Sequence, residues 1–383
     1  MKQIYLDNAA TTAVDEKVVK AMLPYFSEKY GNASSQHLVG QEAKRSLEES
    51  RHIIAKSIGA KDNEIIFTSG GTESNNLVLK GLFFANKEDN NGKNHIIITK
   101  IEHDCVLNAC KWLEKQGAKI TYLSVDKKGF IDLEELKKTI TPETLVVSVI
   151  HGNNEIGTIQ DIKEIGRICK EKETLFHTDA CQSYTKTEIN VKKQNLDLVT
   201  LNAHKIHGPK GVGALCIRQG IKITPLAHGG GHEKNLRSGT ENISGIIGFA
   251  KAVKLADNKH IKHMTMLRDK LINGILQIPN TNLNGPRENR LCNNINIRFN
   301  NVEGEAIGGY LDAYGICGST GSACSSHTLT PSQVLLALGL SPLETNSSLR
   351  LSLSRENTEE EINYVLEVLQ KVIGKLRKMS PIK

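Results

Sequence analysis

A polar segment with two glycines, TSGGTESN at residues 68–75, follows the apolar run 64–68. The glycines let the backbone approach a ligand, and the free amides and hydroxyls of a helix start suit a phosphate group. A capped helix that begins with a tight turn would use the same residue types. On its own, this segment leaves the two interpretations equally open.

An acidic residue and a lysine follow two later apolar runs. Asp179 comes after the run 175–177, and Lys205 comes after the run 197–201. Taken singly, Asp179 is better explained as a helix cap and Lys205 as a solvated loop charge. Enzymes that use pyridoxal phosphate need a phosphate anchor, a carboxylate against the pyridine nitrogen and a Schiff-base lysine. Because all three follow strands of one expected sheet, we predict a pyridoxal-phosphate site.

Three histidines lie near these segments. His204 and His207 are three residues apart, which suits metal binding, but no third ligand with sensible spacing follows. We therefore expect no metal site. His103 follows the run 95–99 and is expected at the edge of the cofactor pocket, although an exposed loop histidine explains its position equally well.

Cys324 lies in a segment of small and hydroxyl residues, GSTGSACSS at 318–326. The segment has no apolar periodicity, which predicts an exposed, mobile loop. An exposed thiol is a liability unless it is used, so this cysteine is interpreted as a nucleophile. The chain has eight cysteines and no Cys-x-x-Cys pair, and we expect the others to be reduced and mostly buried.

These residues require a scaffold that brings the ends of strands together. From about residue 62 onward, short apolar runs alternate with helical patterns, which predicts an α/β domain with a mostly parallel central sheet. Ligands bind such sheets beyond the carboxyl ends of the strands. The expected strands are 64–68, 95–99, 119–123, 145–150, 175–177, 197–201 and 212–217, and the expected helices are 74–86, 106–116, 133–139 and 162–173.

The pattern changes after Gly239, from alternating strands and helices to mostly helices. This change predicts a smaller α+β domain, which the first residues of the chain are expected to join. We place the large domain at residues 15–257 and the small domain at residues 1–14 and 258–383. The elements expected after Gly239 are helices 243–276, 303–314 and 358–376 and strand 294–299.

The composition excludes several classes of protein. With 383 residues, 39% hydrophobic and 24% charged, the chain is ordinary globular material. Its N-terminus lacks the apolar run of a signal peptide and no stretch approaches a bilayer span, so we expect a cytoplasmic protein without membrane contact. The net charge is +7, but scattered lysines and only 4% aromatics favour solvated helix faces over a nucleic-acid groove.

Seven segments stand in the order of one known family: TSGGTESNN (68–76), NNEIGTIQDI (153–162), HTDACQ (177–182), AHKIHGPKG (203–211), RSGTEN (237–242), GSAC (321–324) and SSLRLSLSR (347–355). With them the chain resembles the cysteine desulfurases of the iron–sulfur-cluster-assembly type (group I). These are pyridoxal-phosphate enzymes of the aspartate-aminotransferase fold, fold type I. The resemblance implies a mostly parallel seven-stranded sheet in the large domain, and it covers essentially the whole chain.

The resemblance implies a set of residues around the cofactor ring. Lys205 forms the Schiff base, Asp179 pairs with the pyridinium nitrogen and Gln182 contacts the ring oxygen. His103 stacks on the ring and is the expected acid–base, and Asn154 lies beside it.

The resemblance also implies how the cofactor phosphate is held. Gly71, Thr72, Asn202 and His204 bind it within one subunit. Thr240 reaches the phosphate of the neighbouring subunit, so the site is complete only in a homodimer.

Arg350, with Asn154 nearby, is implied to bind the carboxylate of L-cysteine, and Cys324 to take its sulfur as a persulfide while L-alanine leaves. The implied partners are an iron–sulfur scaffold protein or another acceptor, such as a tRNA-thiolation enzyme. Transient ligation of an iron–sulfur cluster by Cys324 also follows from the resemblance. The GSAC context favours group I over the group whose cysteine lies in a short, rigid Arg-x-Gly-His-His-Cys segment.

Two departures and three alternatives stay open. Position 202 is Asn where the family usually has serine, which predicts altered cofactor affinity because an amide can still donate to phosphate. Position 354 is Ser where glycine is common, and we have no functional interpretation for it. Selenocysteine lyase activity, an aminotransferase of the same fold and a scaffold subunit without catalysis are the alternative functions. Cys324 argues against the aminotransferase, and the intact site residues argue against the scaffold.

Overall fold

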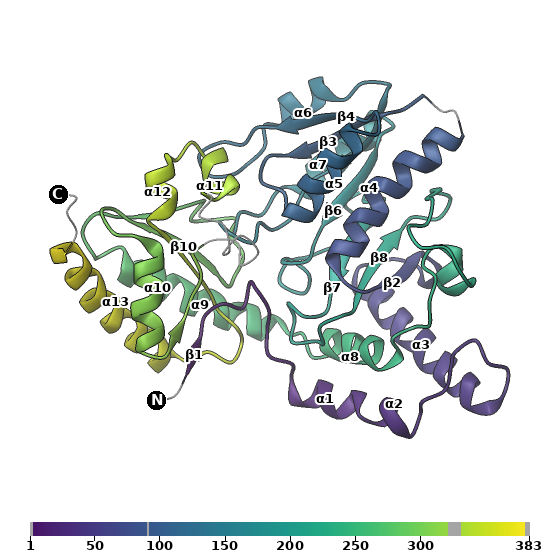
Figure 1. Cartoon of the computed structure of the whole chain (residues 1–383), viewed down its shortest axis with the longest axis horizontal. Coiled ribbons are helices and arrows are strands. Elements are labelled where there is room, and N and C mark those ends of the chain that lie inside the picture. Colours follow the sequence, from purple (N-terminus) through teal and green to yellow (C-terminus); the bar gives the residue numbers. More distant parts are fainter. Residues whose placement is uncertain (1–2, 90–91, 321–330, 380–383) are drawn as a thin grey trace.

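A seven-stranded sheet forms the centre of the larger part of the molecule (Figure 1). The structure is a computed structural model and describes residues 3–89, 92–320 and 331–379. The order of the strands is β2 (Ile65–Thr68), β8 (Gly213–Ile217), β7 (Leu198–Asn202), β6 (Leu175–Asp179), β5 (Thr144–Ser148), β3 (His95–Thr99) and β4 (Lys119–Leu123).

Strand β8 runs antiparallel to both of its neighbours, and the pairings from β7 to β4 are parallel. The prediction of a mostly parallel sheet is therefore confirmed. Because β2 and β7 each run opposite to β8, they point the same way as the rest of the sheet. The carboxyl ends of β2, β6 and β7 consequently meet at one edge, where the candidate residues were expected.

Both faces of the sheet are buried, since alternate residues of the strands pack into two different clusters. On β5, for example, Val147 packs into one cluster and Val146 into the other. Consecutive side chains of a strand point to opposite faces, so continuous apolar runs are what a sheet covered on both sides requires. One face is covered by α3 (Leu38–Ser57), α7 (Ile162–Glu171) and α8 (Ile243–Lys254), and the other by α4 (Gly71–Glu88) and α5 (Asp104–Glu114).

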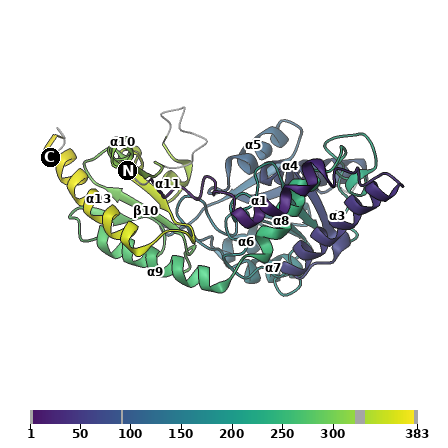
Figure 2. The ribbon, with the colours of Figure 1, turned by 90° about the horizontal axis from the view of Figure 1, so that it is seen from below.

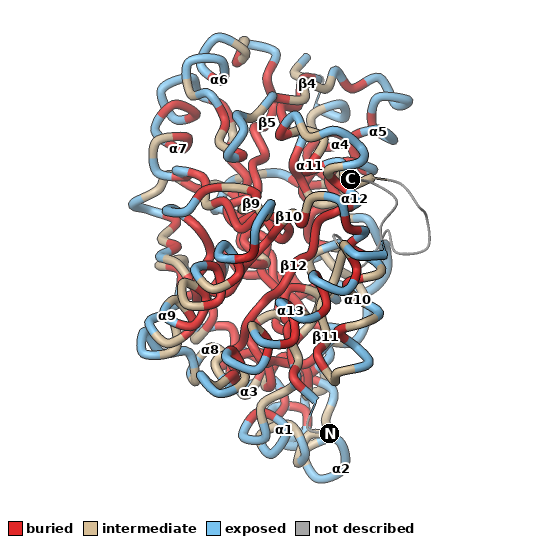
Figure 3. The backbone as a smooth tube through the Cα atoms, turned by 90° about the vertical axis from the view of Figure 1, so that its left-hand side faces the viewer, coloured by how far each residue is buried: buried red, intermediate tan, exposed pale blue. Residues whose placement is uncertain are grey.

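The smaller part of the molecule is built on an antiparallel sheet in the order β12 (Ser348–Ser352), β10 (Asn294–Phe299), β9 (Thr281–Leu283). Its apolar cluster joins this sheet to three helices and to the first residues of the chain. Strand β1 (Ile4–Tyr5) pairs in parallel with β11 (Ile316–Cys317). Figure 2 shows this part beside the larger one. The buried residues lie in the interior of the molecule and the exposed ones on its outside (Figure 3). The three helices are α9 (Asn258–Ile275), α10 (Gly304–Ala313) and α13 (Glu359–Met379).

Several elements differ from the sequence-based prediction. The helix expected over 243–276 is two helices, because Asp257 caps a new helix start by accepting from the backbone N–H of Lys259. Strand β2 begins at Ile65, since residue 64 ends a short 3₁₀ helix, η1 (Asp62–Glu64). Helix α6 (Leu133–Thr139) agrees with its predicted range. Five further helices were not predicted: α1 (Glu16–Met22), α2 (Pro24–Ser27), η2 (His232–Asn235), α11 (Gln333–Ala337) and α12 (Pro342–Asn346).

No helix within the described ranges combines the length and the apolar character that crossing a membrane requires.

Candidate active site

The segment expected to bind phosphate joins β2 to α4. Gly71 begins the helix, and a Cβ atom there would lie 2.6 Å from Sγ of Cys181 and 3.9 Å from Nδ2 of Asn202. A side chain at position 71 would therefore collide with the neighbouring loop. Thr72 is exposed in the first turn. The free amides at the start of this 18-residue helix are suited to an anion, and phosphate binding here stays a prediction.

Asp179 ends strand β6 and is buried. Its Oδ2 accepts from Nδ2 of Asn75 at 2.6 Å, and its Oδ1 accepts from the backbone N–H of Cys181 at 2.9 Å. These donors hold the carboxylate in one orientation at the edge of the sheet. Asp179 is thus a carboxyl group held in one orientation, as a partner for a ring nitrogen needs to be.

Lys205 lies three residues beyond β7, and its Nζ donates to the backbone carbonyl of Ala9. Nε2 of Gln182 donates to the same carbonyl at 2.9 Å, so the two residues meet on one atom. Burial, with a smaller effect of the Arg350 charge, lowers the pKa of Lys205 to about 8. A much larger fraction of this amine is neutral at pH 7 than for a lysine in water, which favours Schiff-base chemistry.

His204 and Asn202 lie on the same stretch of chain as Lys205. Nδ1 of His204 is 3.2 Å from Oγ1 of Thr11, and burial, followed by the nearby charge of Lys205, lowers its pKa to about 4. The ring is therefore neutral at pH 7. Oδ1 of Asn202 is buried without a hydrogen-bond partner in the described part of the chain.

His103 precedes α5 and caps it, because its Nδ1 accepts from the backbone N–H of Cys105 at 3.2 Å. Sγ of Cys105 is 3.1 Å from the same nitrogen and accepts from Asn75 at 3.2 Å. Since Asn75 also contacts Asp179, the structure links His103 to the centre of the site. Neither Asn75 nor Cys105 was predicted to be functional. Asn75 was visible in the motif 68–76, whereas no feature of the sequence marked Cys105.

Arg350 is buried in β12, and its side chain reaches the loop that follows β5 and the first residues of the chain. Its Nη2 lies 2.9 Å from Oδ1 of Asp7, and its Nη1 donates to the backbone carbonyl of Asn154 at 3.3 Å. Its Nε has no hydrogen-bond partner among the described residues. An unsatisfied buried donor on a guanidinium is suited to a carboxylate ligand. The structure thus brings Arg350 and Asn154 together, and it adds Asp7, for which no role was predicted.

One predicted site residue that the structure describes, Thr240, is not part of this cluster. Thr240 is exposed, and among the described residues no hydrogen bond joins it to Gly71, Thr72 or Lys205. Cys324 lies outside the described residues, so its placement stays a prediction.

The residues present fit pyridoxal phosphate by their shape and by their donors. Gly71 leaves open the space that a Cβ would fill, next to Asn202. Around it stand a helix start, a fixed carboxylate at Asp179 and an amine of lowered pKa at Lys205. A lysine, a carboxylate and a phosphate cup at the carboxyl edge of this sheet define a pyridoxal-phosphate enzyme of fold type I.

Comparison with known proteins narrows this class. Residues 4–365 match the family model described as aminotransferase class-V. A protein of Methanosarcina thermophila called cysteine desulfurase IscS is 50% identical over 384 residues, covering 100% of this chain and 94% of that protein. A solved structure titled NIFS-like protein aligns with a TM-score of 0.92 at 39% identity, covering 98% of this chain and 100% of that one. Another, titled SspA in complex with cysteine, aligns with a TM-score of 0.83 at 36% identity and covers 93% and 100%.

The chain belongs to the aminotransferase class-V family and, within it, to the group I cysteine desulfurases.

Proposed function

We propose that this protein removes sulfur from L-cysteine, releasing L-alanine and leaving a persulfide on Cys324. The observation that carries the proposal is the closeness of two groups with different roles. Arg350, suited to a substrate carboxylate, pairs with Asp7, and Lys205 donates to the backbone carbonyl of Ala9, two residues further along the same segment. An amino acid held by Arg350 therefore places its α-carbon near the lysine. Relatives of the same length are called cysteine desulfurases, and a solved relative is described in complex with cysteine.

Bound pyridoxal phosphate supplies an electron sink for negative charge on the α-carbon of the substrate. Lys205 is the residue that would hold the cofactor and, when released from it, move the proton of that carbon. A pKa of about 8 suits the amine to both tasks near neutral pH. Asp179, fixed by two donors, would face the ring nitrogen, and Gln182 would lie against the ring.

Gly71, Thr72, Asn202 and His204 are the proposed phosphate ligands. Gly71 gives close backbone approach, and the nearby amide of Asn202 presents Nδ2 toward the same space. Burial lowers the pKa of His204 to about 4, so its ring is neutral at pH 7 before an anion binds and can offer a hydrogen bond to the phosphate. An asparagine can donate where the family usually places a hydroxyl, so binding is expected to be retained with altered affinity.

Sulfur transfer is assigned to Cys324. Its thiolate attacks the substrate sulfur, the new S–S bond forms, and the bond between that sulfur and Cβ breaks, its electron pair remaining with Cβ, which takes up a proton. The products are the persulfide on Cys324 and alanine, so no external oxidant or reductant is required. His103 is the proposed acid–base for the substrate thiol.

We propose that the protein is a homodimer, because an apolar surface near the N-terminus has no cover within the described chain. A soluble monomer exposes few such clusters, and a second copy is the simplest cover. The exposed large apolar side chains of this segment are Val19, Leu23, Phe26, Tyr30, Leu38 and Val39.

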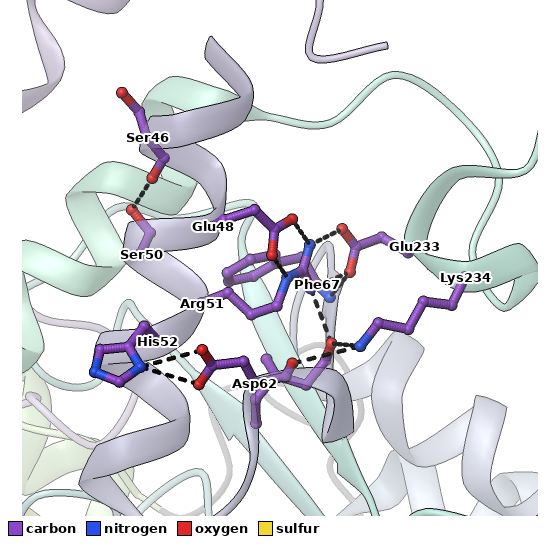
Figure 4. A network of polar contacts seen from close by, with 10 residues as sticks. Ser46, Glu48, Ser50, Arg51, His52, Asp62, Phe67, Glu233 and Lys234 are labelled. Carbon is purple, nitrogen blue, oxygen red and sulfur yellow. Dashed lines mark hydrogen bonds and ion pairs between the residues drawn. The ribbon is translucent and has the colours of Figure 1, made fainter. Parts of the chain in front are cut away.

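The loop that carries Thr240 is anchored by a buried ion pair (Figure 4). Arg51 on α3 donates to both carboxylate oxygens of Glu233 on η2, at 2.8 and 2.7 Å. Glu233 also accepts from the backbone N–H of Phe67 on β2 at 2.7 Å. Further along the loop, Arg237 pairs with Glu73 on α4 at 3.0 Å. These contacts support a loop held firmly enough for Thr240 to serve a site in the neighbouring subunit.

Purified protein tests the proposal through its colour and its products. We expect a visible absorption band that Lys205→Ala lacks, and equimolar alanine and sulfide from L-cysteine with a reductant present. Transfer of the amino group to a 2-oxo acid would identify an aminotransferase instead. A protein that takes up no added pyridoxal phosphate would refute the whole assignment. An iron–sulfur scaffold or another sulfur acceptor is the proposed partner, and selenocysteine is a second substrate to assay.

A further inference from the structure

Asn75 lies between two candidate site residues that are far apart in the sequence. Its Nδ2 donates to Oδ2 of Asp179 at 2.6 Å and to Sγ of Cys105 at 3.2 Å, so both amide protons have a partner. A carboxylate only accepts, which fixes the amide with its nitrogen toward Asp179. The side chain is fully buried, and its Oδ1 has no hydrogen-bond partner in the described part of the chain. A buried oxygen without a partner lowers the stability of the fold, and the two hydrogen bonds donated by the same amide offset this cost.

Cys105 continues this set of hydrogen bonds to His103. Its Sγ lies 3.1 Å from Nδ1 of His103, and its backbone N–H donates to the same nitrogen at 3.2 Å. A backbone amide can only donate, so Nδ1 must be the unprotonated nitrogen of a neutral ring. The thiol then also donates to Nδ1. Burial, assisted by the charge of Asp179, raises the pKa of Cys105 to about 12, which keeps the S–H proton in place at neutral pH.

We propose that Asn75 and Cys105 are positioning residues that hold His103 as the tautomer protonated at Nε2 and couple it to the Asp179 carboxylate. The nitrogen on the far side of the ring from Cys105 then carries the proton. His103 thus enters the reaction as a hydrogen-bond donor and acid, and it becomes a base only after that proton has left. The inference rests on the proposed function only in giving His103 a part in the reaction.

The chemistry of position 105 provides matched variants. The thiol accepts from Asn75 and donates to His103, with the Thr72 side chain as a further hydrogen-bonding neighbour, and a serine hydroxyl can make the same contacts. An alanine at this position keeps the backbone N–H but makes none of these side-chain contacts. Cys110 provides the control, because it is buried on the same helix but packs in the apolar cluster around α4 and α5.

The test is long-range ¹⁵N–¹H NMR of the full-length chain labelled with ¹⁵N-histidine, with the signals of His103 assigned by His103→Gln. We expect the Nε2-protonated tautomer in the wild-type protein, both free of cofactor and loaded with pyridoxal phosphate. Cys105→Ser should keep it. In Cys105→Ala the ratio of the two tautomers should shift by about two- to tenfold toward Nδ1–H, the range that one hydrogen bond of ordinary net strength supplies. Cys110→Ala should leave the ratio unchanged.

A second measurement is the pH profile of alanine formation. Cys105→Ala and Asn75→Ala should displace the profile, whereas Cys105→Ser should keep its shape. A wild-type His103 protonated at Nδ1 would overturn the proposal, and so would a tautomer ratio and a pH profile that are both unchanged in Cys105→Ala. The NMR result is obtained without turnover. If the expected tautomer were found but no alanine formed from cysteine, the proposed function would fail and the positioning role would stand.

Discussion

Ser319 and Arg350 exchange two backbone hydrogen bonds, from Ser319 N–H to Arg350 O at 3.0 Å and from Arg350 N–H to Ser319 O at 2.6 Å. Arg350 is the proposed ligand of the substrate carboxylate, and Ser319 lies five positions before Cys324 in the sequence. The residue that binds the substrate and the segment that leads to the sulfur-accepting thiol are therefore paired like neighbouring strands. A shift of the backbone at Ser319 would therefore also move the backbone at Arg350.

The first prediction concerns substrate binding. Arg350→Ala should raise the KM for L-cysteine strongly, because a buried carboxylate that loses a charged partner costs about 2–5 kcal/mol. Arg350→Lys should restore binding only in part, since an ammonium cannot form the paired bonds of a guanidinium. Steady-state kinetics of alanine formation measure both variants. Arg218→Ala is the control, because Arg218 is exposed and pairs with Asp197 at the start of β7. If Arg350→Ala kept the wild-type KM, Arg350 would not be a ligand of the substrate carboxylate.

The second prediction follows from the pKa of Lys205. Burial first, and the Arg350 charge second, lower this pKa from 10.5 to about 8. Only the neutral amine reacts with an aldehyde, so uptake of pyridoxal phosphate by cofactor-free protein should quicken by about tenfold per pH unit below pH 8. Above pH 8 the rate should level off. Stopped-flow absorbance follows the uptake, and Lys222→Arg at an exposed position provides the control. If the rate of uptake continued to rise toward pH 10.5, Lys205 would have the pKa of an ordinary lysine.

Lys205, Asp179 and the segment 68–75 could be placed from the sequence because each follows an apolar run that becomes a strand of one sheet. The carboxyl ends of those strands meet at one edge for geometric reasons, so position along the chain was enough. Asp7 and the carbonyl of Ala9 could not be found in this way. They reach the site only through packing of the first residues of the chain against segments more than a hundred residues away.

Cys105 was missed for a different reason. Its function depends on one helical turn that brings its thiol and its backbone N–H to the same nitrogen of His103. The sequence shows only two residues separated by one position. The helices before residue 62 were also absent from the prediction, because they precede the alternation of apolar runs and helical patterns that indicates the sheet.

The third prediction concerns which cysteine accepts the sulfur and which cysteines are unreactive. Burial raises the pKa of Cys105 to about 12, and burial also raises the pKa of Cys110 and Cys181 above the ordinary value of a thiol. Thiolates are the reactive form, so these cysteines should resist alkylation at neutral pH. After turnover with L-cysteine, mass spectrometry should find the extra sulfur on Cys324. Cys324→Ser should form almost no persulfide, whereas Cys110→Ser should behave as the wild type. Persulfide found on Cys105 in the wild-type protein would show that Cys105 accepts the sulfur and would contradict the assignment of Cys324.

The fourth prediction concerns the buried pair of Arg51 and Glu233. Glu233→Gln removes the buried one of the two carboxylates that pair with the Arg51 guanidinium and should lower the free energy of unfolding by about 3–5 kcal/mol. Glu48→Gln removes the other carboxylate near Arg51, but this one is half exposed, so about 0–1 kcal/mol is expected. The double variant Arg51→Met/Glu233→Leu should lose less than Glu233→Gln alone, because no charge is left buried. Urea unfolding measures all three. Equal losses for Glu233→Gln and Glu48→Gln would show that burial does not govern this network.

The last prediction tests whether two chains share one site. Glu233, Lys234 and Asn235 all have positive φ values, of 40°, 59° and 65°, a conformation that non-glycine residues adopt at a cost. The surrounding contacts maintain this backbone a few residues before Thr240, which is exposed on its own chain. A loop held in a costly shape with its functional residue facing outward is suited to a neighbouring subunit. Lys205→Ala and Thr240→Ala homodimers should therefore both be impaired, because each site lacks one of the two residues.

In a heterodimer of the two variants, both lesions fall in one site and the other site receives wild-type Lys205 and wild-type Thr240. Heterodimers purified through two different affinity tags should consequently show about half of the wild-type activity, since one site of two is intact in a two-fold dimer. Heterodimers of Lys205→Ala with Cys324→Ser measure in the same way whether the cysteine acts within its own chain. If Thr240 served the site of its own chain, the first heterodimer would pair one site lacking Lys205 with one lacking Thr240. Its activity would then be no higher than the average of the two homodimers, and the shared site would be refuted.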